Sequence, residues 1–459
     1  MSWYDTLLQN LPQVEGPQQK KLDFTVKLKW TLIVLALFYI LTQIPLYGLG
    51  QSALAQFEAL SVILGAEFGS LVSLGIGPIV TASIVLQLLN GSGLVKFNTN
   101  TAEGKARFQG TNKLMSYGFL IFESIIYVIM GGLAPAAELA GTSTYAMLET
   151  VLILQLIFGG FIIILLDDLV SKWGLGSGIS LFIAAGVAKS LFIKTFSMFA
   201  SPSNPEYVVG AIPTIFQALS NADFTQILLS VAAILATIFV FGLAVYFQSM
   251  KVEIPLSFGR VRGYGMRWPL NFLYTSNTPV ILIAALLANV QLGAALLNSK
   301  FGLTQAQSIA NWFQAPPLLT TIISSGTLNI GWTLYAQALF YMCVIMLGAL
   351  VFSWFWMQSS GMDAHSQAKQ IMNSGLQIPG FRNDPRIMEH ILARYIGPLT
   401  IMGGLTVGFL AAIADISGAL TSGTGLLLTI MIVYRLYEDV ARQHMTDMNP
   451  MMKKFMGGR

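Results

Sequence analysis

The chain has 459 residues, of which 54% are hydrophobic and only 10% are charged, and its mean hydropathy is +0.67. Soluble domains carry about 25% charged residues, so this chain has too few to cover a compact soluble protein, and that class is excluded. The single cysteine, Cys343, excludes internal disulfides and a cysteine-based metal cluster.

Nine segments are long and apolar enough to cross a membrane, which takes about 20 mostly apolar residues. In chain order they are Trp30–Tyr47, Lys113–Leu133, Tyr145–Leu166, Ile179–Phe199, Gln226–Phe247, Phe272–Leu292, Trp332–Trp356, His390–Ile413 and Gly418–Leu436.

The segment Ser52–Asn90, between the first two spans, does not follow this pattern. Ser52–Phe68 is short and weakly apolar, and the glycine-rich stretch Leu74–Pro78 separates it from the apolar Ile79–Leu89. Proline favours a helix start because its missing N–H is not needed in the first turn. We interpret this segment as a re-entrant half-helix followed by a crossing helix, which makes ten crossings in total.

Basic residues are distributed unevenly between the two sides of these spans. Of the 25 lysines and arginines, only Lys189, Lys194 and Lys300 fall on connections of one side, and all the others fall on the opposite side or in the terminal segments. Cytoplasmic loops hold the excess of positive charge. We therefore expect both termini in the cytoplasm, as an even number of crossings requires.

A polar linker, Ser201–Tyr207, separates the first five spans from the last five. We expect an N-terminal half of residues 1–200 and a C-terminal half of residues 201–459. Because each half has an odd number of crossings, the two halves are inserted with opposite orientation, an arrangement common in transport proteins.

Ionisable residues at membrane depth are costly and mark function, and here they are scarce. Glu123 is in the middle of a span, Asp415 is near the outer end of the ninth span, and Asp167 and Asp168 are at a cytoplasmic end, where we expect a solvated boundary. An ion-coupled transporter needs several such groups as a relay. We find no catalytic constellation, and we expect no enzyme activity, no cofactor and no metal.

Several motifs in both halves resemble the SecY family, the large subunit of the Sec protein-conducting channel. The sequences of these motifs are closest to the archaeal branch of the family. The resemblance covers essentially the whole chain and is carried by LGIGPIVTASIVLQLLNGSG (Leu74–Gly93), FQGTNKL (Phe108–Leu114), LDDLVSKWGLGSGISLFIAAGV (Leu166–Val187), IPLSFGRVRG (Ile254–Gly263), SNTPVIL (Ser276–Leu282), PGFRND (Pro379–Asp384) and GTGLLLTIMIVYRLYE (Gly423–Glu438).

The resemblance implies an all-α polytopic membrane protein, with ten transmembrane helices in two inverted five-helix halves around a central hourglass pore. The family closes this pore with a ring of aliphatic side chains. Matched motif by motif, the ring consists of Ile76, Val80, Ile179, Ile183, Ile281 and Leu428.

The family also has a plug below the ring and a lateral gate towards the lipid. The resemblance places the gate cluster at Thr81, Glu123 and Asn277, which also accounts for a lone glutamate in mid-span. The plug corresponds to Glu58, Ala59, Leu60, Ser61, Val62, Ile63, Leu64, Gly65, Ala66, Glu67 and Phe68.

The implied function is translocation of unfolded secretory polypeptides across the membrane and lateral release of transmembrane segments into the lipid bilayer. The implied partners are the ribosome, signal sequences and nascent polypeptides, a SecE-type subunit and a small one-span beta-type subunit. The implied location is the plasma membrane. The ribosome contacts are Arg260, Arg262, Arg382 and Arg386, on two cytoplasmic loops.

Two other functions stay open at this point. A secondary transporter for a small solute fits the inverted halves and the broken helix, but lacks the expected carboxylate relay. A membrane-embedded hydrolase has no residues that support it.

Overall fold

The computed structural model describes residues 8, 10–18, 22–50, 67–91, 94–95, 97, 101–139, 141–200, 206–258, 265–275, 278–327, 331–373, 376–377 and 384–448. The first helices are α2 (Phe24–Thr42), α4 (Gly77–Gly91), α5 (Ala102–Ile129), the 3-10 helix η2 (Ala137–Leu139), α6 (Ser143–Trp173) and α7 (Gly178–Phe196). The elements that follow are α8 (Ala211–Ser220), α9 (Phe224–Ser249), β1 (Lys251–Phe258), β2 (Gly265–Asn271), α10 (Thr278–Phe301), α11 (Thr304–Asn311), α12 (Leu318–Ser325), α13 (Trp332–Ser359), α14 (Ala364–Asn373), β3 (Leu376–Gln377), α15 (Pro385–Ile416) and α16 (Gly423–Met448).

Eight helices within the described ranges are long and apolar enough to cross a membrane: α2, α5, α6, α7, α9, α10, the α13 segment and α15. They correspond to eight of the nine clear spans predicted from the sequence. The helix α4 is apolar but shorter, and α16 is not among the eight. The second half of α16 carries Arg435, Glu438 and Asp439, which lower the hydropathy of this helix. The total of ten crossings therefore stays a prediction.

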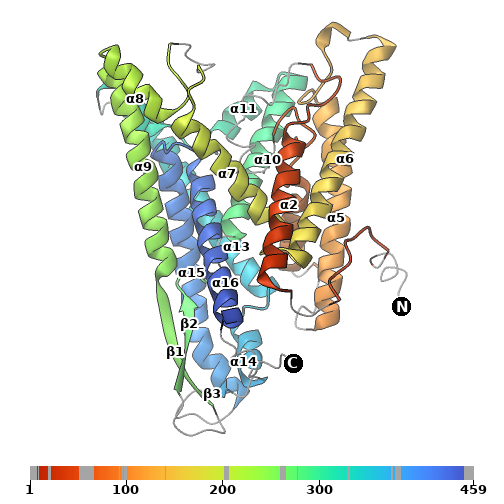
Figure 1. Ribbon diagram of the computed structural model, residues 1–459, viewed down its shortest axis with the longest axis vertical. Coiled ribbons are helices and arrows are strands. Elements are labelled where there is room, and N and C mark those ends of the chain that lie inside the picture. Colours follow the sequence, from red (N-terminus) through yellow and green to blue (C-terminus); the bar gives the residue numbers. More distant parts are fainter. Residues whose placement is uncertain are drawn as a thin grey trace.

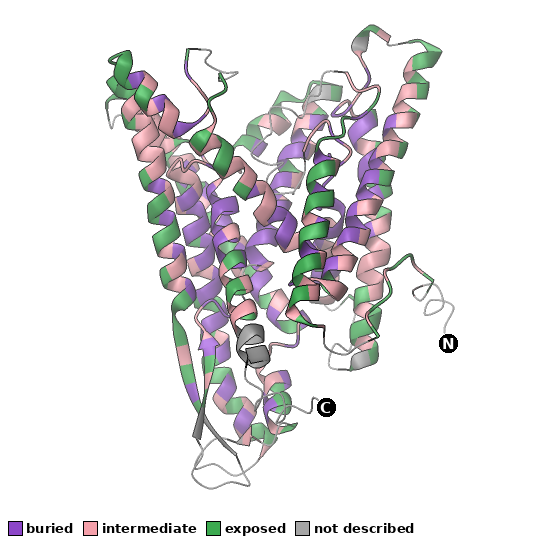
Figure 2. Ribbon diagram, in the orientation of Figure 1, coloured by how far each residue is buried: buried purple, intermediate pink, exposed green. Residues whose placement is uncertain are grey.

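The surface of the helical bundle is apolar, as expected for a protein in lipid. On α9, large side chains such as Ile238, Phe239 and Phe241 are more than half exposed. Figure 2 shows exposed residues along the outer helices and buried ones along the central helices. The apolar window of α10 is 67% buried, whereas that of α2 is 17% buried. Helix α10 therefore lies at the centre of the bundle and α2 at its periphery, where exposed apolar surface marks a membrane or partner contact.

Helix starts are capped by the short polar residues that precede them. The Thr101 side chain accepts a hydrogen bond from the N–H of Gly104 at the start of α5, and Thr142 does the same for Tyr145 at the start of α6. Such caps satisfy backbone donors that have no partner within the helix. The local sequence therefore determines where these helices begin.

A small antiparallel sheet projects from one end of the helical bundle, beyond the end of α9 (Figure 1). Its strand order is β2-β1-β3, and β1 pairs with β2 from Lys251↔Asn271 to Ser257↔Gly265. Ile254 and Leu270 are buried in a second apolar cluster shared with α14 and α15. The sequence reading did not predict this sheet. Its strands alternate apolar and polar residues, a pattern that the sequence itself carries; we expected only a connection between two spans here.

Candidate functional site: the central constriction and the polar contact beside it

The six predicted ring residues come from four separate parts of the chain. Ile76 directly precedes α4 and Val80 is in its first turn. Ile281 and Leu428 belong to α10 and α16, and the other two belong to α7. The turn before α4 depends on Gly75, whose φ of +51° lies in the left-handed region that favours glycine. This bend directs both Ile76 and the first turn of α4 to the centre of the bundle.

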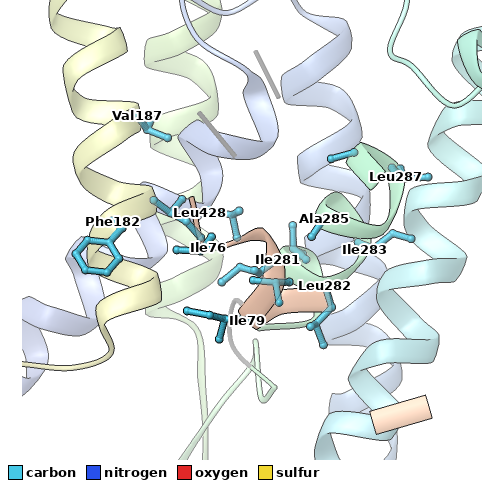
Figure 3. Packing of buried hydrophobic residues seen from close by; sticks show 14 of the residues in the cluster. Ile76, Ile79, Phe182, Val187, Ile281, Leu282, Ile283, Ala285, Leu287 and Leu428 are labelled. Atoms are coloured by element: carbon cyan, nitrogen blue, oxygen red, sulfur yellow. The ribbon is translucent and has the colours of Figure 1, made fainter. Parts of the chain in front are cut away.

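The structure brings these six side chains into one apolar cluster. Ile76 is 1% exposed, Ile183 and Leu428 are fully buried, and Val80 and Ile281 are also buried. Ile179 is partly buried and packs against the same cluster. Figure 3 shows Ile76, Ile281 and Leu428 within this cluster.

This cluster is the main apolar core of the bundle, with buried members from Val34 of α2 to Ile432 of α16. Ile79, Phe182, Val187 and Leu282 are also buried in it (Figure 3). A narrow constriction lined by aliphatic side chains has no groups that hold water, so it excludes ions by dewetting. The same side chains make no directional bonds, and an extended peptide can therefore pass without being bound.

One polar contact joins three helices next to the constriction. Thr81 of α4 donates a hydrogen bond from Oγ1 to Oε1 of Glu123 on α5, at 2.9 Å. Asn289 of α10 donates from Nδ2 to Oγ1 of Thr81, at 3.0 Å. Glu123 is only 8% exposed. The structure thus connects two of the predicted gate residues directly.

The third member of this contact, Asn289, was missed by the sequence reading. The predicted residue, Asn277, lies outside the described residues. The available signal for Asn289 was an amide in the middle of an apolar helix, where an unpaired polar group is costly. Asn277 precedes α10 and both Asn289 and Asn298 lie within it, and the sequence pattern does not distinguish which one reaches Thr81.

Beside the polar contact, a cavity of about 390 Å³ separates parts of α4, α5 and α13. Ser83 and Gln87 line it from α4, Asn112 lines it from α5, and Trp356 and Ser359 line it from α13. The side chains that face each other across this cavity are mostly polar. The cavity and the contact of Thr81 with Asn289 lie along the same boundary between helices.

Most of the predicted plug, from Glu58 to Ala66, lies outside the described residues. Its last two residues are described. Glu67 forms an ion pair with Lys189 of α7, with Oε2 and Nζ 2.8 Å apart, and Phe68 packs against the central apolar cluster. The end of the predicted plug therefore lies against a helix that carries two ring residues.

Three predicted ribosome contacts, Arg260, Arg262 and Arg382, lie outside the described residues. Arg386 is exposed near the start of α15, where its N–H donates to Asp384. The strand β1, which precedes the segment with Arg260 and Arg262, pairs with β3, which precedes the segment with Arg382, at Ser257↔Gln377 and Phe258↔Leu376.

Among the described residues, no three His, Cys, Asp or Glu side chains are close enough to hold a metal ion.

Comparisons with known proteins point to one family. The model of the family described as "SecY" matches residues 70–437, and the model described as "Plug domain of Sec61p" matches residues 37–69. The chain is 42% identical over 458 residues to a protein of Methanothermobacter thermautotrophicus named "Protein translocase subunit SecY", which covers 99% of this chain and 98% of that protein.

Solved structures show the same similarity. The chain matches "The structure of a protein conducting channel" with a TM-score of 0.80 and 37% identity, over 97% of this chain and 98% of the other. It matches "Sec61 in the Canine ribosome-channel complex from the endoplasmic reticulum" with a TM-score of 0.77 and 37% identity, again over 97% and 98% of the two chains.

Proposed function

The chain belongs to the SecY family and is a protein translocase subunit of the protein-conducting channel, and from this premise we propose which residues perform each part of its function. The seal against ions is the aliphatic ring. The observation that carries this proposal is that four separate parts of the chain contribute its members to the main apolar core, in which five are buried and against which Ile179 packs. The ring consists of Ile76, Val80, Ile179, Ile183, Ile281 and Leu428.

The lateral gate opens between α4 and α5 on one side and α10 and α13 on the other. The gate contact is Thr81 with Glu123 and Asn289, and Asn277 stays a predicted member. A signal sequence has about 20 apolar residues, each of which favours lipid by about 0.3–0.6 kcal/mol. Since hydrogen bonds between membrane helices contribute only about 0.6 kcal/mol on average, insertion of such a segment can separate these helices.

The plug is Glu58–Phe68, in agreement with the plug-domain match to residues 37–69. In this proposal the ion pair of Glu67 with Lys189 anchors the end of the plug to α7. The anchor is half-exposed, so its contribution to stability is small, which suits a segment that must move when a chain passes.

The arginines Arg260, Arg262, Arg382 and Arg386 form a platform for the ribosome. The pairing of β1 with β3 supports this proposal, because one strand precedes Arg260 and Arg262 in the chain and the other precedes Arg382 and Arg386. The planar guanidinium group binds phosphate groups through several hydrogen bonds. The related Sec61 in the canine complex is described as part of a ribosome-channel complex.

The remaining assignments follow from the same premise. The chain is a polytopic membrane protein, and we place it in the plasma membrane with both termini in the cytoplasm, where the basic residues are concentrated. Its two inverted halves are residues 1–200 and 201–459. Its partners are a SecE-type subunit and a one-span beta-type subunit, along with signal sequences and nascent polypeptides.

Crosslinking of a stalled nascent chain tests the position of the pore. A photoreactive amino acid replaces Ile76 or Ile281 in the full channel, and Ile238 on the lipid-facing side of α9 serves as the control. We expect crosslinks to the nascent chain from both ring positions and none from position 238. Equal crosslinking at all three positions, or none at the ring, would contradict the proposed pore.

The platform is tested separately by Arg262→Glu. We expect weaker co-sedimentation with ribosomes at modest salt, because contacts with phosphates depend on ionic strength. Lys300→Glu, a change of the same charge on the opposite side, is the matched control. If both variants bind ribosomes equally well, Arg262 is not part of the platform.

A further inference from the structure

The two helices α7 and α16, which carry ring residues, both begin against a carboxylate at the end of the preceding helix. In the first case the carboxylate is Asp167, near the end of α6. Its Oδ1 accepts a hydrogen bond from the N–H of Ile179 at 3.0 Å. Ile179 is itself a ring residue. A Cβ atom at Gly178 would lie 2.7 Å from the same oxygen, so a glycine is needed for this close approach.

In the second case the carboxylate is Asp415, near the end of α15. Its Oδ1 accepts a hydrogen bond from the N–H of Thr424 at 2.8 Å, and the Thr424 hydroxyl also donates to this carboxylate. A Cβ atom at Gly423 would lie 2.2 Å from the backbone nitrogen of Asp415. The ring residue Leu428 follows about one turn further along α16. Both ring helices therefore start with a glycine held against an aspartate.

The same sites are also bound to a helix at the gate. At the first site, the neighbouring Asp168 forms an ion pair with Lys113 of α5, with Nζ and Oδ2 3.0 Å apart. At the second site, the hydroxyl of Tyr341 on α13 donates to Oδ2 of Asp415 at 2.7 Å. Thus α13 bonds directly to the carboxylate that holds the start of α16, whereas α5 is paired with Asp168 of α6, the residue next to the one that holds the start of α7.

The two sites correspond to each other in the inverted arrangement. In Figure 1 α7 and α16 run in opposite directions, and their starts lie towards opposite ends of the bundle. Apart from the short α14 and β3, the order of elements is also the same: a gate helix, a helix with an aspartate near its end, and a helix that carries ring residues and begins with glycine. We expected Asp167 and Asp168 at a solvated boundary. The structure shows both half-buried, with Asp167 bonded to the N–H of Ile179 and Asp168 paired with Lys113.

We propose that Asp167 with Asp168, and separately Asp415, are positioning residues that couple α7 and α16 each to a gate helix, so that movement of α5 or α13 displaces the ring residues of α7 or α16. This inference rests on the proposed gate and ring. A carboxylate at a helix start holds that helix through its free N–H groups. If the same carboxylate, or its neighbour, is held by a gate helix, then the ring helix cannot keep its position when the gate helix moves.

Ordinary helix capping would give a different result, and single substitutions distinguish the two. Lys113→Met removes the connection to α5, whereas Lys172→Met removes an ion pair with the same Asp168 from within α6, at 3.2 Å. Tyr341→Phe removes the connection to α13. Its control is Thr237→Val, which removes a hydroxyl of α9 that accepts the N–H of Leu420 in the same α15–α16 connection. Each control loses a comparable contact but keeps the connection to the gate helix.

The experiment measures gate and ring in the same complete channel in planar bilayers. The probe is a synthetic signal peptide with a leucine-rich core of about 20 residues. Gate opening is measured as the distance between labels at Ile121 on α5 and Leu339 on α13, both exposed, and ring opening as ion conductance. We expect the peptide to widen the gate in all variants. The rise in conductance should fall about tenfold in Lys113→Met and Tyr341→Phe and stay unchanged in the two controls.

Equal conductance responses in test and control variants, at equal widening of the gate, would overturn the coupling. If Tyr341→Phe does not fold, the comparison of Lys113→Met with Lys172→Met decides alone. A failure of the proposed function is distinguishable, because the unaltered channel would then show neither widening nor conductance with the peptide.

Discussion

The contact of α13 with α15 and the contact of α4 with α10 are built in opposite ways. On α15, a Cβ atom at Gly408 would lie 2.8 Å from Cα of Met346 on α13, so the two backbones touch through glycine. Between α4 and α10, the polar link is a hydrogen bond of Asn289 to Thr81. Close packing of backbones allows no partial opening, whereas a hydrogen bond exchanges at low cost. The contact of α13 with α15 is therefore the more rigid of the two, and in the proposed function the molecule opens across α4 and α10.

The largest expected effect comes from breaking the rigid contact. Gly408→Val places a branched side chain against the backbone of α13, and overpacking of this kind costs about 3 kcal/mol. We expect a clear fall in the thermal unfolding midpoint of the purified protein. Gly397→Val on the same helix is the control, since a Cβ atom there meets no neighbouring atom within 4 Å. A similar loss in both variants would show that the contact is not the cause.

The second effect concerns the constriction, to which both α4 and α10 contribute ring residues. Leu428→Asn places an amide at a fully buried position and favours a hydrated pore. A change of about 1.4 kcal/mol in the free energy of the hydrated pore changes its population tenfold. We therefore expect resting ion conductance in planar bilayers to rise by about tenfold or more. Leu428→Met keeps the position apolar and should stay sealed. Unchanged conductance in Leu428→Asn would remove this residue from the ring.

The third effect tests the opening contact itself. Thr81→Val keeps the side-chain shape but removes the hydrogen bonds to Glu123 and Asn289. The lost hydrogen bonds stabilise the closed gate by about 1 kcal/mol, so their removal raises the ratio of open to closed gate about fivefold. The shift is measured from distances between labels on α5 and α13. Ser83→Ala is the control, because Ser83 bonds to Asn112 of α5, on the same side of the gate, and its loss should leave the distances unchanged.

The smallest effect lies at the start of α9, outside both contacts. Asp223 accepts hydrogen bonds from the N–H of Gln226, the Tyr207 hydroxyl and the N–H of Thr225, and these lower the pKa of its carboxyl group. A lowered pKa stabilises the folded form above the ordinary value of about 3.9, and this contribution is lost as the pH falls through the folded-state pKa. We expect hydrogen-exchange protection of the Thr225 and Gln226 amides to fall as the pH is lowered below the ordinary value of about 3.9.

Asp223→Asn is the matched control for this pH dependence. Asparagine is also a good residue before a helix start, but it does not titrate in this range. Protection of the two amides should therefore be independent of pH in the variant. A pH dependence that persists in Asp223→Asn would assign the effect to another group.

The sequence predicted the spans well and the gate contact only in part. Eight spans were confirmed because about 20 apolar residues in a row have few alternatives to crossing a membrane. The six ring positions were predicted from motifs, and the structure places them in one apolar cluster, although their role as the seal stays a prediction. Asn289 was missed, because motif matching does not show which amide on a helix faces a neighbour 208 residues away in the chain.

What the sequence alone determined is which parts of this protein lie in lipid, since hydrocarbon admits few charged groups and the chain has few to distribute. Tertiary structure decided which polar groups meet. It joined Asn289 to Thr81, Asp415 to Tyr341, and β1 to β3. The physical reason is that the free energy of burying apolar surface is a sum over the side chains of each segment, so composition determines it. A hydrogen bond, in contrast, requires two particular atoms within about 3 Å of each other. Such pairs form only when distant segments are packed together.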